Sequence, residues 1–145
     1  MKRLSEPVRI TVLAVFGMVA AISLVTVSSA TGNVSKGDLA GNFQITLGGL
    51  TGCGQSTELA TITLNGNGSG TGSLHTHGSC GDSSLTGQTF TVTSLKTNGS
   101  GTAGLSCGTG CGWTFTIQVS PDRSTFNMVD LTDPDNYLEG TAVHQ

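Results

Sequence analysis

The sequence predicts an all-β domain, an eight-stranded antiparallel up-and-down (meander) barrel that disulfides join at one end. Short segments alternate apolar and polar residues, which is typical of strands with one buried and one solvated face. Turn sequences rich in Gly, Asn, Asp and Pro separate neighbouring segments, and no long helical periodicity follows residue 30. A closed barrel leaves no sheet edge unpaired, so we prefer it to a β-sandwich of the same strands, which is the alternative.

Residues 1–30 are predicted to be a secretory signal peptide. Three basic residues precede an apolar segment over 10–27, and small residues at 28–30 suit a signal peptidase. We expect cleavage after Ala30 and a secreted, periplasmic or extracellular protein. Retention as a membrane anchor is the alternative, because the apolar segment approaches the length of a membrane span.

The exported part divides into a polar lead-in over 31–40 and a single β-barrel domain over 41–145. It keeps three basic and eight acidic residues, a net charge of −5. Such a chain attracts neither nucleic acid nor an anionic membrane surface, so we expect neither as a partner once the signal is cleaved.

The first three strands are expected at 41–47, 58–65 and 70–77. Phe, Ile and Leu alternate with polar residues along the first, and Ile and Leu share one face of the second. The third is rich in small residues and has one main apolar side chain, a leucine. A Gly-rich loop over 48–57 joins the first two, and a tight Gly-Asn-Gly-Ser turn at 66–69 joins the next pair.

The fourth and fifth strands are expected at 88–95 and 101–107. A second long loop over 78–87 precedes the fourth strand, in which a phenylalanine and a valine share one face. A Thr-Asn-Gly-Ser turn at 97–100 separates the two strands, and a short loop bracketed by cysteines follows at 108–111. Each hairpin contains the sequence Asn-Gly-Ser-Gly-Thr at an offset of 31 residues, which indicates duplication of a hairpin.

The last three strands begin with a hairpin over 112–131. Apolar residues alternate with Thr and Gln from Trp113 to Val119, the sequence Ser-Pro-Asp-Arg at 120–123 suits a type I turn, and apolar residues return on one face afterwards. Because this hairpin holds the only tryptophan, we predict that it forms the floor of the core. The eighth strand is expected at 136–144.

One face of these strands is predicted to fill the barrel with apolar side chains. The inward set is Phe43, Ile45, Leu47, Ile62, Leu64, Leu74, Phe90, Val92, Leu105, Trp113, Phe115, Ile117, Phe126 and Met128. A barrel of this size either holds one small ligand or fills with side chains. If it binds a ligand, the candidate binding residues in the barrel or at its rim are Phe43, Leu74, Phe90, Leu105, Trp113 and Phe115.

All four cysteines, Cys53, Cys80, Cys107 and Cys111, lie in the exported part. An even number in an oxidising compartment predicts two disulfides, and a zinc site is the less favoured alternative. Alternate loops of a meander lie at the same end, so all four cysteines should meet at one rim. Of the three possible pairings we favour 53 with 80, which links the two long loops, and 107 with 111, which closes the short one.

Candidate catalytic and metal-binding groups are few. His75 and His77 share a strand face and are a candidate metal pair, with Asp82 or Asp135 as a third ligand; two exposed histidines on a polar face are the alternative. Glu139 would be a buried carboxyl if it pointed inward, but we expect it to point outward. No nucleophile elbow or opposed pair of carboxylates is evident, so we predict no enzyme activity and no cofactor.

The strand order over residues 41–144 resembles the lipocalin and avidin-like class of small secreted barrels. Gly41-Asn42-Phe43 stands where a lipocalin has Gly-x-Trp, at the start of the first strand, with Phe in place of Trp. No avidin-type set of biotin-binding residues can be placed on this chain. The resemblance implies the barrel architecture and the binding of a small molecule.

We therefore predict a secreted, non-enzymatic β-barrel that binds a small apolar molecule or a surface component at its Cys-rich end. The alternative is a structural or cell-surface interaction protein, with a filled barrel and a Thr-, Ser- and Asn-rich face that contacts a cell-surface polymer.

Overall fold

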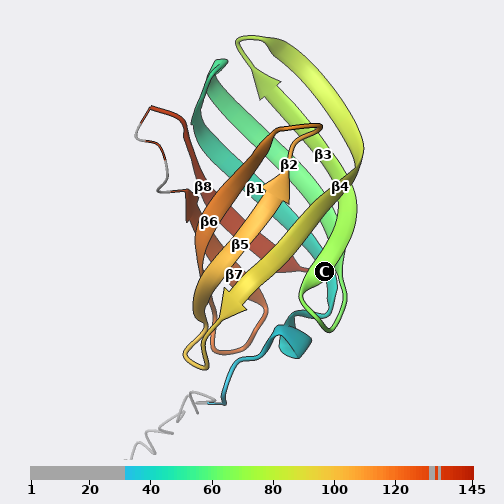
Figure 1. The fold of residues 1–145 in the computed structure, drawn as a ribbon, viewed down its shortest axis with the longest axis vertical. Coiled ribbons are helices and arrows are strands. Elements are labelled where there is room, and N and C mark those ends of the chain that lie inside the picture. The colour runs from blue at the N-terminus through green and yellow to red at the C-terminus, as the bar shows by residue number, and fades with distance from the viewer. Residues whose placement is uncertain (1–31, 131–132, 134) are drawn as a thin grey trace, which may run out of the picture.

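A computed structural model describes residues 32–130, 133 and 135–145; the predicted signal peptide lies outside the described residues. Eight antiparallel strands form a closed barrel in sequence order, with β8 pairing back to β1 (Figure 1). This confirms the predicted fold class. The strands are β1 (Gly41–Thr51), β2 (Gly54–Leu64), β3 (Ser69–Gly78), β4 (Gly81–Leu95), β5 (Ser100–Ser106), β6 (Gly112–Val119), β7 (Thr125–Asp130) and β8 (Tyr137–His144).

The connections alternate between two ends of the barrel, as expected for a meander. The β2–β3, β4–β5 and β6–β7 turns lie at one end, which we call the tight-turn end. The connections at 52–53, 79–80 and 107–111 carry all four cysteines and lie at the opposite, Cys-rich end, at the top of Figure 1. Asn136, which precedes β8, lies beside the cysteines at this end too.

The prediction of two long loops, at 48–57 and 78–87, is wrong. Strands β1 and β2 continue in register until Thr51 faces Gly54, and β3 and β4 continue until Gly78 faces Gly81. Two-residue turns therefore replace the loops. These segments lack apolar alternation, but backbone pairing extends the hairpins with glycine and small polar residues beyond the packed core.

The predicted inward set forms the core of the barrel, with one exception. Thirteen of its fourteen members are buried, and their cluster also takes in Ala60, Ala103, Val119, Leu138 and Ala142. The Phe126 ring lies 5.3 Å from that of Phe43 and 5.8 Å from that of Phe90. Trp113 is only partly buried, because β6 starts beside Cys111 and places it near the Cys-rich end, not on the floor of the core.

The lead-in packs against the tight-turn end, although its sequence shows no pattern. It forms a 3-10 helix, η1 (Lys36–Leu39), and buries Val34 and Leu39 in the core cluster. The Val34 N–H donates to the carbonyl of Thr97 at 3.0 Å, and the Lys36 ammonium donates to the carbonyl of Thr93 at 3.1 Å. The lead-in thus covers this end of the barrel (Figure 1).

The repeated Asn-Gly-Ser-Gly-Thr sequences form equivalent turns. Gly68 and Gly99 both have φ of +83°, a left-handed conformation that favours glycine. Each carbonyl accepts a hydrogen bond from a valine N–H of a following strand, at 2.8 and 2.9 Å. The duplication inferred from sequence therefore has a structural counterpart. Among the described residues, no helix is long and apolar enough to cross a membrane.

Candidate functional site

A cavity of about 550 Å³ opens at the Cys-rich end, and we call it the mouth cavity. Residues of β2, β3, β4 and β6 line it, together with Asn136 and both cysteine pairs. The inward positions at this end carry small polar side chains, at Ser56, Thr76 and Ser83. The inward positions nearer the tight-turn end carry Phe, Leu and Ile. Because small polar side chains continue the inward face, the core stops short of this end and leaves a cavity of ligand size.

Glu58 is the most buried residue that lines the mouth cavity, at 3% exposed. It lies on the inward face of β2, two residues from Ala60 and four from Ile62. Its Oε2 is buried and accepts no hydrogen bond. Burial raises the pKa of this carboxyl from 4.5 to about 7.

Glu58 is not among the site residues predicted from the sequence, in which Glu139 is the candidate buried carboxyl. Glu139 is exposed and points outward, as expected. The signal for Glu58 was present, because the alternation set by Ile62 and Leu64 extends back to Ala60 and Glu58. The predicted strand begins at Glu58. Because a residue at the end of a strand is usually exposed to solvent, the alternation was not extended to it.

Asn136, in the β7–β8 connection, supplies a second buried acceptor without a partner. Its Oδ1 is shielded from solvent and has no hydrogen-bond donor near it. By contrast, the hydroxyl groups around the mouth cavity pair with one another: Thr76 with Ser83 at 2.7 Å, and Thr51 with Ser56 at 2.9 Å. Two residues that line the cavity, Glu58 and Asn136, therefore each have a buried acceptor oxygen without a partner, whereas the neighbouring hydroxyl groups pair with one another.

The disulfides follow the favoured pairing and frame the mouth cavity. Cys53–Cys80 joins the tips of the β1–β2 and β3–β4 hairpins, and Cys107–Cys111 closes the β5–β6 connection. The Ser79 N–H also donates to the carbonyl of Cys53 at 3.2 Å. No cysteine is free, so none provides a thiol nucleophile or a zinc ligand. The cross-links restrict the conformations that the rim can adopt.

Charge is separated between the two ends of the barrel. The lysines and arginines of the described residues, Lys36, Lys96 and Arg123, all lie in the lead-in or the tight turns. Among the described residues, the Asp, Glu, Lys, Arg and His side chains toward the Cys-rich end are two histidines and six acids, with no lysine or arginine. The acids are Glu58, Asp82, Asp130, Asp133, Asp135 and Glu139. The open end is therefore strongly anionic, and its potential attracts cations.

The six predicted ligand-binding residues divide into two groups. Five are fully buried in the core cluster and do not line the mouth cavity: Phe43, Leu74, Phe90, Leu105 and Phe115. Trp113 does line it, near Leu85. Of the six, Trp113 is thus the residue that an incoming small molecule can reach.

The candidate metal pair lies outside the barrel. His75 and His77 are both exposed on the outer face of β3, where His75 hydrogen-bonds Ser84 at 2.8 Å and His77 pairs with Asp82. His144 lies at the tight-turn end, with its ring edge-on to that of Phe43. Within the described residues, no group of three or more His, Cys, Asp or Glu side chains is arranged to hold a metal ion.

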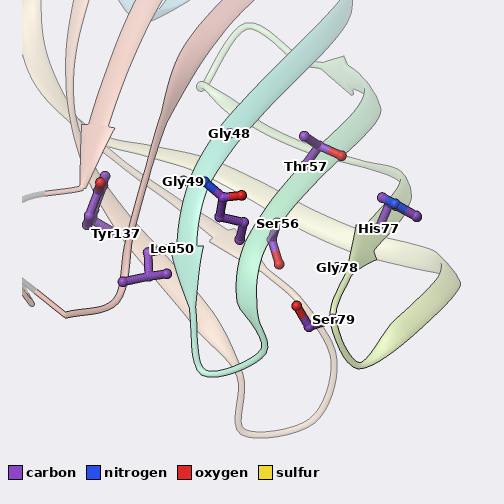
Figure 2. A pocket seen from close by; sticks show the side chains of 10 residues that line it. Gly48, Gly49, Leu50, Ser56, Thr57, His77, Gly78, Ser79 and Tyr137 are labelled. Atoms are coloured by element: carbon purple, nitrogen blue, oxygen red, sulfur yellow. The ribbon is translucent and has the colours of Figure 1, made fainter.

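A second hollow, the outer groove, lies on the outer wall of β1–β3 near the Cys-rich end (Figure 2). Gly48, Gly49 and Gly78 are among its lining residues, and its volume is about 700 Å³. Figure 2 shows Tyr137 on one side of β1 and His77 on the far side of β2. Tyr137 is 40% exposed and is the aromatic residue of this surface.

No protein-family model matches the chain, and no curated protein matches its sequence. The resemblance to lipocalins in strand order therefore stays a prediction.

Proposed function

We propose that this is a non-enzymatic binding protein that holds a small molecule in the mouth cavity. The observation that carries the proposal is the buried Glu58 side chain, which lines this cavity and has one carboxyl oxygen without a hydrogen-bond partner. A buried carboxyl without a partner lowers stability, so its presence at the base of a cavity is characteristic of a functional site. The core below is packed and the lead-in covers the far end, so a ligand enters from the Cys-rich end.

Binding accounts for this site better than catalysis does. Glycoside hydrolysis, the reaction that two acids at a cavity would suggest, needs a pair of opposed carboxyl groups. Glu58 and Asp82 both line the mouth cavity, but Asp82 is exposed and paired with His77. Asp130, another buried acid, is not among the residues that line it.

Two adjacent serines provide a matched test of this function. Ser83 lines the mouth cavity and bonds to Thr76, whereas Ser84 faces the outer wall and bonds to His75. Ser83→Phe should block the cavity, and Ser84→Phe should add the same bulk outside. We would purify both variants and the unaltered protein unreduced, extract small molecules that co-purify, and record amide NMR spectra with mixtures of cationic, neutral and anionic fragments.

The expected result is that compounds shift the Trp113 indole signal in the unaltered protein and in Ser84→Phe, but not in Ser83→Phe. Equal binding by both variants, or no effect of any fragment on residues of the mouth cavity, would refute the proposed function.

The outer groove supports a second candidate, contact with a cell-surface polymer. A glycine-lined hollow beside an exposed tyrosine suits a sugar ring stacked on an aromatic face. Tyr137→Ala should then weaken retention on immobilised cell-wall polysaccharide, with Ser83→Phe as the control that leaves this retention intact. Retention that Tyr137→Ala leaves unchanged would exclude this role for the groove.

We also propose that the protein is exported. Two disulfides are compatible with an oxidising compartment. N-terminal sequencing of the exported protein should begin at Thr31, and a chain that still begins at Met1 would show that the segment is retained.

A further inference from the structure

We propose that the ligand of the mouth cavity is a small protonated amine, with Glu58 as its counter-ion and Asn136 as a second acceptor. This inference rests on the proposed function and names the class of molecule that the cavity takes.

The unpartnered groups define what the ligand must offer. Glu58 Oε2 and the Asn136 amide oxygen both need hydrogen-bond donors, and neither receives one from the protein. A primary ammonium group has three donors and no acceptor, so one such group can satisfy several acceptor oxygens. It also supplies the positive charge that an ionised, desolvated carboxylate lacks.

The surroundings of the cavity favour a cation over a neutral donor or an anion. No Lys or Arg among the described residues lies at the Cys-rich end, and Asp82 lines the same cavity as Glu58. An anion would meet the buried Glu58 carboxyl, with no lysine or arginine at this end to compensate its charge. Trp113 adds an aromatic side chain at the mouth, and aromatic rings attract organic cations.

A metal ion suits this cavity less well than an organic cation. Hard divalent cations take about six to eight oxygen ligands, commonly from several carboxylates. Glu58 is the one buried carboxyl that lines the cavity, and no metal-holding cluster of acids and histidines occurs within the described part of the chain. The apolar contacts of Leu85 and Trp113 instead suit the carbon skeleton of an amine.

Binding of an amine should depend on the ionisation of Glu58. Its pKa of about 7 means that the carboxyl is largely neutral in the free protein at pH 5.5 and largely ionised at pH 8. An amine that needs the carboxylate should then bind about thirtyfold more weakly at pH 5.5 than at pH 8. The other acids of this end are Asp82 in the same cavity, Asp130 on β7, and Asp133, Asp135 and Glu139 at or beside the β7–β8 connection.

The test compares three probes of the same shape and different charge: phenethylammonium chloride, 2-phenylethanol and sodium phenylacetate. Each is titrated by calorimetry into the exported protein at pH 8 and pH 5.5. The variants are Glu58→Gln, which keeps the size of the side chain but removes its charge, and Glu139→Gln, which removes an exposed charge of the same end. Circular dichroism confirms that both variants are folded.

The amine should bind more tightly than the alcohol and the carboxylate, and Glu58→Gln should weaken it at least about tenfold and remove its pH dependence. Glu139→Gln should leave the affinity nearly unchanged. Equal binding of alcohol and amine, or an amine affinity that Glu58→Gln leaves intact, would overturn the amine assignment and leave the proposed function standing. If none of the three probes binds, but another compound binds the unaltered protein and not Ser83→Phe, the amine assignment is wrong and the proposed function stands. If no compound binds at the mouth cavity, both proposals are wrong.

Discussion

Replacing Glu58 by glutamine keeps the shape of the side chain but removes its ionisation, and this should change how stability depends on pH. The carboxyl has an ordinary pKa of 4.5 and a pKa of about 7 in the folded protein, because burial disfavours its charged form. Between these values the folded state binds more protons than the unfolded state. The free energy of unfolding therefore falls as pH rises through this window, and levels off above it.

The size of the effect follows from the two pKa values. Each unit of difference between the folded and unfolded pKa is worth about 1.4 kcal/mol. The difference for Glu58 therefore corresponds to about 3 kcal/mol of stability that is present at pH 4 and lost by pH 8. Glu58→Gln has no such loss. Its stability relative to the unaltered protein should thus rise by about 3 kcal/mol from pH 4 to pH 8.

Urea unfolding with the disulfides intact, followed by the fluorescence of Trp113, measures this difference at several pH values. Other titrating groups are common to both proteins, so their contributions cancel. Glu139→Gln is the control, because it removes an exposed carboxyl of the same end.

A constant difference between Glu58→Gln and the unaltered protein across this range would show that the carboxyl keeps its ordinary pKa. Water would then reach it, and the argument from desolvation would be wrong. A difference that changes in the opposite direction would show that a cationic group pairs with Glu58 in the folded state.

Two further predictions concern the barrel itself. By loop entropy, removing the Cys53–Cys80 disulfide, which spans 27 residues, should cost about 3.5 kcal/mol, and removing Cys107–Cys111, which spans 4, only about 2 kcal/mol; equal losses in urea unfolding of paired serine variants would contradict this order. A Cβ atom on Gly72 would lie 1.8 Å from the Thr61 carbonyl oxygen, whereas one on Gly48 would meet nothing within 4 Å. Gly72→Ala should therefore destabilise the protein by about 2 kcal/mol or more and Gly48→Ala should not, and equal melting temperatures would refute the close approach of β2 and β3.

The architecture followed from patterns that need only neighbouring residues. Alternation along 112–119 and the turn sequence after it depend on local sterics and on one buried face, so the β6–β7 hairpin could be predicted directly. The same reasoning placed all four cysteines at one end, because alternate connections of a meander share an end.

Local patterns failed where pairing with a distant strand decided the outcome. Residues 48–57 resemble a glycine-rich loop, yet they form the end of the β1–β2 hairpin, and the distant strands β8 and β3 pair along its two arms, at 48–50 and at 56–57. Val34 and Leu39 show no period of their own, and they are buried because the barrel end offers them an apolar surface. In both cases the partner that stabilises the segment lies elsewhere in the chain.

The sequence by itself determined that apolar and polar residues alternate along the strands, where the turns of the tight-turn end lie, and that the cysteines meet at the other end. The tertiary structure alone decided that the inward face changes from apolar to small and polar side chains before that end, and that Glu58 lies there without a partner. The physical reason is that burial and the absence of a hydrogen-bond donor depend on all the strands around the barrel, whereas alternation depends on one strand.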